Sequence, residues 1–218
     1  MTARLAVFDC DGTLIDGQAS ICEAMEQAFA EFGLPCPDRN EIRRAVGLSL
    51  PQAVHRLLPE SERETHHAIA EAYKRAFRMA RAEGRIFQPL FDGIKDVLQA
   101  LRASGWQLGV ATGMSDRGLE HCLAMHGLTR HFVSLQTADR HPSKPHPAML
   151  EAALFEAAAQ PAHAVMIGDT AFDMQMACDA GVRAIGVAWG YHTPRELLAA
   201  GAEYIAESPL ELSQYLLR

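Results

Sequence analysis

The 218-residue sequence lacks an excess of positive charge and long apolar runs, and each absence excludes a class of protein. Twenty Lys and Arg against 27 Asp and Glu give a formal net charge of -7. This balance disfavours non-specific binding to nucleic acid or to an anionic membrane, since both need clustered cations. The first apolar run, residues 5–8, is followed by acids and is too short for a signal peptide or a membrane span. We therefore expect neither a nucleic-acid nor a membrane partner.

Paired cysteines are absent as well. The five cysteines are odd in number, and none has a partner at Cys-x-x-Cys spacing, a usage typical of a reducing compartment. We therefore expect a cytoplasmic protein. Hydrophobic residues make up 49% of the chain, which is enough to bury a core and disfavours disorder. The length suits one large domain, or a core with a small insert.

Short apolar segments alternate with helical patterns along most of the chain. Buried strands are predicted at residues 5–8, 107–111, 132–135, 164–167 and 183–187, with a short last strand near 203–206. Helical patterns lie between them at residues 93–103, 116–126, 147–158 and 172–180, and a further helix runs to the C-terminus. Alternation at this spacing indicates an α/β fold, a doubly wound Rossmann-like parallel sheet covered on both faces.

Residues 17–85 interrupt this alternation with helical periodicity alone. Two apolar stripes recur at helical spacing, namely Cys22, Met25, Phe29 and Phe32, and Ile69, Tyr73, Phe77 and Ala80. We predict a helical cap domain, residues 16–86, inserted after the first strand of a core domain formed by residues 1–15 and 87–218. The two crossings, near residues 15–17 and 86–89, are candidate hinges because of their position and their Gly and Pro content.

Two carboxylates, Asp9 and Asp11, stand two residues apart directly after the first apolar run. Gly12 permits a sharp exit from the strand, so both side chains are expected at its carboxyl end, where open α/β sheets bind their ligands. Two acids this close repel each other, whereas a bound cation lets one stay ionised. The pair suggests a Mg²⁺ site with one Asp as nucleophile and the other as proton shuttle, although turns also favour Asp and Gly.

Further polar groups follow other predicted strands. Thr112-Gly113 offers a hydroxyl and an unencumbered backbone N–H for a phosphoryl oxygen. Lys144 lies in a loop stiffened by three prolines, which helps to aim an ammonium, although a surface lysine in a turn is the ordinary interpretation. Asp169 and Asp173 are four residues apart and share one face of a helix that starts there. Oxygen ligands without His or Cys select a hard cation such as Mg²⁺ over zinc.

In order and spacing, these groups resemble the four motifs of the haloacid dehalogenase superfamily. The first motif is Asp9-Cys10-Asp11-Gly12-Thr13, the second is Thr112, the third is Lys144, and the fourth is Asp169 with Asp173. The insert is similar to the small helical C1 cap of phosphoglycolate-phosphatase-like and beta-phosphoglucomutase-like members, and the likeness extends to residues 187–192.

The resemblance implies a phosphoryl transfer in two steps. Asp9 would attack phosphorus to give an aspartyl phosphate, while Asp11 would protonate the leaving oxygen and then deprotonate the hydrolytic water. It also implies that Mg²⁺ is held by Asp9, Asp169 and the Asp11 backbone carbonyl.

The same resemblance assigns the remaining site residues. Thr112, Gly113 and Lys144 would neutralise the transferring oxygens, and Asp173 would orient Lys144 or a metal-bound water. The implied partner is a small phosphorylated metabolite, bound by a monomer or weak homodimer.

Within the family, two chemistries are disfavoured. Dehalogenating relatives do not keep an acid two residues after the nucleophile, and Asp11 is present here. Phosphonatases form a Schiff base with a cap lysine, and Lys74, the only lysine of the insert, lies in a helix whose pattern is structural. We therefore expect hydrolysis of a small phosphate monoester such as phosphoglycolate or a sugar phosphate. Inorganic pyrophosphate stays open as a substrate. The alternative to an enzyme is a non-catalytic binding protein on the same fold.

A sugar phosphomutase keeps both acids, so the cap must distinguish it. In beta-phosphoglucomutase-like members, basic residues flank the cap-loop glycine and bind the second phosphate, whereas the residues around Gly47 are apolar at those places. Arg43 and Arg44, one helical turn earlier, are candidate contacts for an anionic substrate, or else exposed helix charges. We therefore favour hydrolysis over mutase chemistry.

Overall fold

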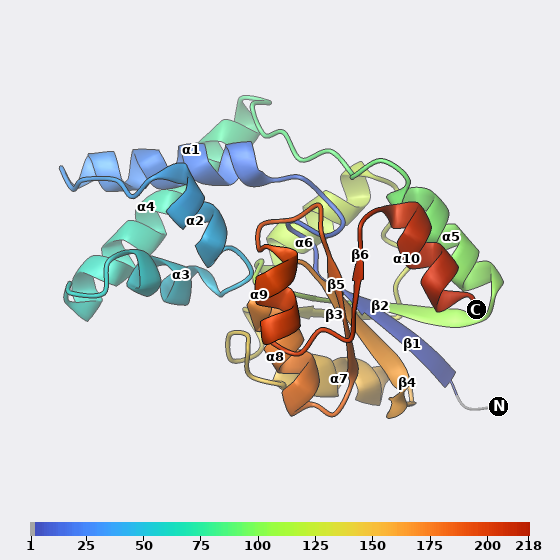
Figure 1. Cartoon of the computed structure of the whole chain (residues 1–218). Helices are drawn as coiled ribbons and strands as arrows, with labels where there is room; N and C mark the ends of the chain where they lie inside the picture. Colours follow the sequence, from blue (N-terminus) through green and yellow to red (C-terminus); the bar gives the residue numbers. More distant parts are fainter. Residues whose placement is uncertain (1–2) are drawn as a thin grey trace.

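The core of the protein is a six-stranded parallel sheet with strand order β3-β2-β1-β4-β5-β6 (Figure 1). The computed structural model describes residues 3–218, so residues 1–2 of the expected core segment lie outside the described residues. The strands are β1 (Ala3–Phe8), β2 (Trp106–Thr112), β3 (Ser134–Thr137), β4 (Ala159–Gly168), β5 (Arg183–Val187) and β6 (Tyr204–Ala206). The doubly wound α/β fold expected from the sequence is thus confirmed.

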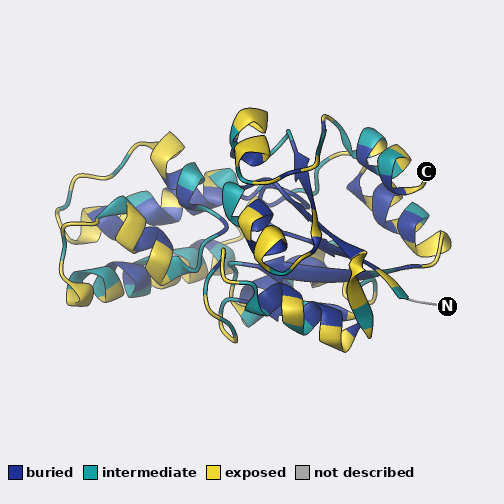
Figure 2. Ribbon diagram, turned by 60° about the horizontal axis from the view of Figure 1, so that its bottom comes forward, coloured by how far each residue is buried: buried dark blue, intermediate teal, exposed yellow. Residues whose placement is uncertain are grey.

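Both faces of the sheet are covered, because successive side chains of a strand point to opposite faces. Ala6 and Phe8 of β1 pack against one set of helices, α5 (Ile94–Ala103), α6 (Asp116–Met125) and α10 (Pro209–Leu216). Leu5 and Val7 pack against the other set, α7 (Ala148–Glu156), α8 (Ala171–Asp179) and α9 (Pro194–Ala199). Figure 2 shows most strand residues and the inner helix faces as buried, whereas the first half of β4 is mostly exposed. The continuous apolar run of β1 reflects this two-sided burial.

Three core elements differ from the sequence-based expectation. Strand β4 begins five residues earlier than predicted, at Ala159 instead of residue 164. Strand β3 begins two residues later than predicted, because Ser134 pairs with Gly109 of β2 whereas Val133 is 53% exposed. Helix α9 was not predicted, since its six residues are too few to show a periodicity. Its signal is the capping box formed by Thr193 and Glu196, which satisfies backbone N–H groups of the first turn.

The segment between β1 and α5 forms four helices, α1 (Gln18–Glu31), α2 (Arg39–Ala45), α3 (Leu50–Leu57) and α4 (Arg63–Ala82). These helices, called the cap below, lie to one side of the sheet in Figure 1 and enclose an apolar cluster of their own. Phe29 and Ile69 of the predicted stripes lie in that cluster, whereas Phe32 is 41% exposed because it follows the last turn of α1. Among the described residues, no helix is long and apolar enough to cross a membrane.

The two chain crossings between core and cap lie side by side. The Asp16 N–H donates to the Pro89 carbonyl at 2.8 Å, and Ile15 forms an antiparallel bridge with Leu90. The cap therefore leaves and re-enters the core at one place, next to the carboxyl end of β1.

Candidate active site

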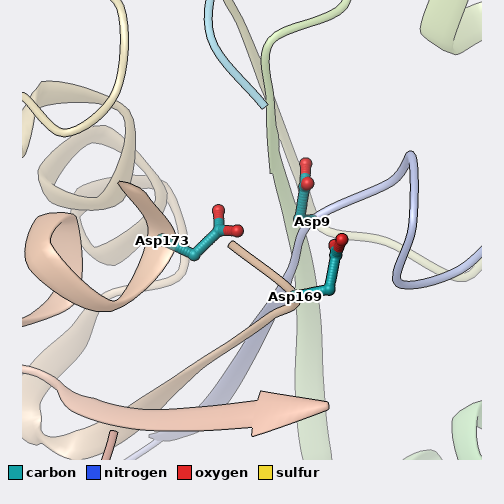
Figure 3. A group of neighbouring side chains, drawn as sticks. All are labelled: Asp9, Asp169 and Asp173. Atoms are coloured by element: carbon teal, nitrogen blue, oxygen red, sulfur yellow. The ribbon is translucent and has the colours of Figure 1, made fainter. Parts of the chain in front are cut away.

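The candidate site lies where the sheet changes its winding direction. From β1 the chain order runs outward through β2 on one side and through β4 on the other, which leaves a crevice at the carboxyl ends of β1 and β4. Phe8 is in register with Val110 of β2 and Ile167 of β4, so these strands end at the same level. Asp9 and Asp169, which directly follow β1 and β4, are therefore brought next to each other (Figure 3).

Two glycines make room for the Asp169 carboxylate. Gly12 turns the chain after β1 with φ +90°, and a Cβ there would lie 2.2 Å from Asp169 Oδ2. A Cβ on Gly190, from the loop after β5, would lie 2.1 Å from the Asp169 Cβ. Both contacts are shorter than real Cβ contacts allow, so these positions require glycine because the backbone must approach the acid closely.

Three buried carboxylates form a cluster. Asp9, Asp169 and Asp173 each place an oxygen within 4.8 Å of the others, and all are fully buried. Asp169 accepts hydrogen bonds from the Thr13 hydroxyl at 2.7 Å and the Tyr191 N–H at 2.9 Å. Burial, together with the charges of Asp9 and Asp173, raises the pKa of Asp169 well above its usual range. Such a cluster of hard oxygen donors fits Mg²⁺, whose charge would offset the repulsion between the acids.

Lys144 bridges two of these acids and is not the surface lysine that its loop would ordinarily carry. Its side chain is fully buried, and its Nζ lies 2.6 Å from Asp173 Oδ1 and 2.8 Å from Asp9 Oδ1. Burial opposes its charge, yet Asp173 and Asp9 together raise the pKa of the ammonium above its ordinary value. Asp173 is fixed in turn by the Thr170 hydroxyl at 2.6 Å, within the capping box of α8. The structure thus brings Asp173 onto Lys144, as the resemblance implied.

The two acids of the first motif differ in their surroundings. Burial raises the pKa of Asp9 to about 6 against the attraction of Lys144. Burial and the neighbouring charge of Asp9 raise the pKa of Asp11 to about 7. Asp11 Oδ1 is also buried without a partner in residues 3–218, and a Cβ on Gly17 would lie 2.5 Å from it. Near pH 7, Asp9 is therefore the readier of the two to ionise, and Asp11 the readier to hold a proton.

A cavity of about 500 Å³ opens above these acids, between core and cap. Its core side includes Asp9, Asp11, Thr112 and Gly113, and its cap side includes the loop residues 46–49. The cap is close to the core, because a Cβ on Gly113 would lie 2.4 Å from the Leu48 carbonyl oxygen. The Ser49 N–H also donates to Ser143 Oγ at 2.8 Å, in the loop that carries Lys144. The cavity therefore encloses the space next to both acids of the first motif.

Arg43 and Arg44, the candidate substrate contacts of the cap, engage other parts of the protein. Neither residue lines the cavity. Arg44 instead forms an ion pair with Glu196 of α9, and Arg43 donates to Gln18 at 2.9 Å. Arg44 therefore lies at the junction of cap and core, whereas Arg43 contacts another cap helix, α1.

Several cavity residues were missed by the sequence reasoning. They lie on one face of α4, and the sequence signal that would have found them is their helical spacing at positions 73, 74, 77, 78 and 81. Lys74, expected to be structural, is exposed at the rim, where it pairs with Glu71 at 2.8 Å. Arg117, near the start of α6, completes this wall from the core side.

Comparisons with known proteins agree with this geometry. Residues 6–187 match the family model described as "Haloacid dehalogenase-like hydrolase". The chain is 36% identical to "Probable phosphatase IndB" of Dickeya dadantii (strain 3937), over 94% of this chain and 89% of that protein. It is 27% identical to "Phosphoglycolate phosphatase" of Vibrio vulnificus (strain YJ016), over 98% and 96% of the two chains. A crystal structure of "a predicted phosphatase from Clostridium acetobutylicum" matches with a TM-score of 0.89 and 26% identity, over 100% and 99% of the chains.

Proposed function

Because the chain belongs to the haloacid dehalogenase-like hydrolases, we propose that it is a Mg²⁺-dependent phosphatase that hydrolyses small phosphate monoesters through an aspartyl phosphate. The observation that carries this proposal is the pairing of Asp9 with Asp11 at one cavity. Asp9 is held by Lys144 Nζ at 2.8 Å, and Asp11 has a pKa of about 7. One group is thus suited to attack, and the other to carry a proton near neutral pH.

In the first step, the ionised Asp9 carboxylate attacks phosphorus and the ester P–O bond breaks. The leaving oxygen takes the proton held by Asp11, which thereby becomes a carboxylate. Lys144, the Thr112 hydroxyl and the Gly113 N–H lie at the strand ends, where they are suited to bind the transferring oxygens. Since Lys144 is locked between two acids, its ammonium needs little reorganisation during the transfer.

In the second step, water attacks the phosphorus of the aspartyl phosphate. The Asp11 carboxylate takes a proton from that water, the acyl phosphate P–O bond breaks, and the Asp9 carboxylate is regenerated with release of inorganic phosphate. Asp9, Asp169 and the Asp11 backbone carbonyl would hold Mg²⁺, which would supply positive charge beside the phosphoryl oxygens.

Two features support hydrolysis of a monoester over phosphomutase chemistry. The cap loop carries Val46 and Leu48 on either side of Gly47, so it presents no cation there to a second phosphate. Relatives named phosphatase and phosphoglycolate phosphatase support a small monoester such as phosphoglycolate or a sugar phosphate as the substrate.

The test is a screen of phosphorylated metabolites for phosphate release with Mg²⁺ and with EDTA. We expect Mg²⁺-dependent release, which Asp9→Asn reduces below a few per cent while Asp179→Asn, an exposed acid on α8, leaves it unchanged. Silence across the panel would favour a binding protein. Formation of an isomer without free phosphate, in the presence of a bisphosphate activator, would favour the mutase.

A further inference from the structure

Cations gather on the cavity wall formed by α4 and the start of α6. Lys74, Arg78, Arg81 and Arg117 all line the cavity that contains Asp9. Lys74 is neutralised by Glu71, but none of the three arginines has a carboxylate within 4.0 Å among the described residues. Elsewhere in residues 3–218, six arginines do have such a partner, namely Arg39, Arg44, Arg75, Arg85, Arg140 and Arg183. Three arginines without a carboxylate partner thus line the cavity that also contains the reacting acids.

Arg81 is the most constrained of these cations. Its side chain is half-buried, its guanidinium lies 5.5 Å from the centroid of the Phe77 ring, and its Nε is buried without a hydrogen-bond partner among the described residues. Burial and the charge of Arg117 lower its pKa. A buried donor without an acceptor is unfavourable, so the Arg81 Nε is available to an acceptor that a ligand brings.

Arg81 and Arg117 come from different parts of the fold. Arg81 lies in the last turn of the cap helix α4, whereas Arg117 lies in the first turn of the core helix α6. Both arginines also lower the pKa of His121, and only burial has a larger effect on it. The positive potential therefore extends one turn along α6. Two like charges brought together across the boundary of cap and core repel each other unless an anion lies between them.

We infer that Arg81 and Arg117 form a subsite for a second anionic group on the leaving group of the substrate. The inference rests on the proposed phosphatase function and narrows its substrate class to monoesters whose alcohol carries a carboxylate or a further phosphate. The transferring phosphoryl group is bound by Lys144 and the strand ends, and the rest of the 500 Å³ cavity has room for the alcohol to reach the arginines. An anion at this subsite would also hold the cap against the core.

Matched substrate pairs test the subsite. The pairs are phosphoglycolate with ethyl phosphate, 3-phosphoglycerate with glycerol 3-phosphate, and glucose 1,6-bisphosphate with glucose 6-phosphate. The first two pairs test a carboxylate as the second anion, and the third pair tests a second phosphate. For the better anionic member, we expect Arg81→Gln and Arg117→Gln each to lower kcat/KM about 10- to 100-fold, as the loss of a charged hydrogen bond does. For the member without the second anion, the change should stay within about threefold.

Arg75→Gln is the matched control, because Arg75 also lies on α4 but pairs with Glu31 outside the cavity. It should leave both members of each pair unchanged. Arg117 is exposed, so Arg117→Gln remains informative even if Arg81→Gln fails to fold, and Arg81→Lys should recover part of the loss. Equal losses on both members of a pair, or no loss on either, would overturn the subsite.

Binding to an inactive protein separates this inference from the proposed function. We expect 3-phosphoglycerate to bind the Asp9→Asn protein more tightly than glycerol 3-phosphate in calorimetric titration, and Arg117→Gln to remove that preference. If no monoester is hydrolysed, the phosphatase proposal fails, while this titration still decides the subsite. Equal affinity of the two ligands would refute the subsite even if the enzyme is an active phosphatase.

Discussion

Replacing the proposed nucleophile should make the metal-free protein more stable. In the folded state burial raises the pKa of Asp9 from 3.8 to about 6, despite the attraction of Lys144. The folded protein therefore retains a proton that the unfolded chain releases earlier, and its stability falls as the pH rises from about 4 to about 6. Asparagine has nearly the same shape and does not titrate, so Asp9→Asn avoids this loss.

The magnitude follows from the pKa difference of 6 - 3.8, about 2.2 units. At about 1.36 kcal/mol per unit, ionised Asp9 destabilises the fold by about 3 kcal/mol at pH 8. For a chain of this length, a change of that size corresponds to roughly 6–12 °C in Tm. We therefore expect the stability of Asp9→Asn relative to the unaltered protein to increase by about 2 kcal/mol between pH 4.5 and pH 8 in EDTA, because the unfolded chain has already released most of this proton at pH 4.5.

The assay is thermal and urea unfolding of both proteins in EDTA across that pH range, with Asp179→Asn as an exposed control. Mg²⁺ should then stabilise the unaltered protein more than Asp9→Asn, because the variant lacks one proposed ligand. The same variant should have lost phosphate release. A stability difference that does not change with pH would refute the assignment of a buried, destabilising charge to Asp9.

Two other changes test how the cap meets the core. Gly113→Ala places a methyl group 2.4 Å from the Leu48 carbonyl oxygen of the cap. Such overpacking costs about 1–3 kcal/mol. We therefore expect kcat/KM to fall about 5- to 150-fold, with little change in Tm. An unchanged kcat/KM would mean that turnover does not need this approach of cap and core. His192 is buried, accepts from the Ala171 N–H at 3.1 Å, and donates to the Arg44 carbonyl at 3.3 Å. Burial lowers its pKa from 6.5, so the unfolded state takes up the proton first and stability falls as the pH drops below about 6.5. His192→Asn should lose less stability between pH 7.5 and pH 5.5, and parallel pH profiles in urea unfolding would contradict this.

The strand-end residues were predictable because a parallel sheet brings the residues that follow its strands to the same edge. Asp9, Thr112 and Asp169 each follow an apolar run, and pairing of the runs in parallel brings their carboxyl ends together. No comparable rule applies to the cap. Whether Arg44 or Arg81 lines the cavity that contains the acids depends on how α2 and α4 are rotated against the core, which their own periodicity does not specify.

The sequence by itself determined the fold class, the order of the elements and the set of polar groups at the strand ends, because strand formation and chain exit are governed by neighbouring residues. Only the tertiary structure decided which charges are paired. It buries Lys144 between Asp173 and Asp9, engages Arg44 with a core glutamate, and leaves Arg81 without a partner among the described residues. Burial and the position of opposite charges depend on groups far apart along the chain, and these set both the protonation of the acids and the proposed preference for the substrate.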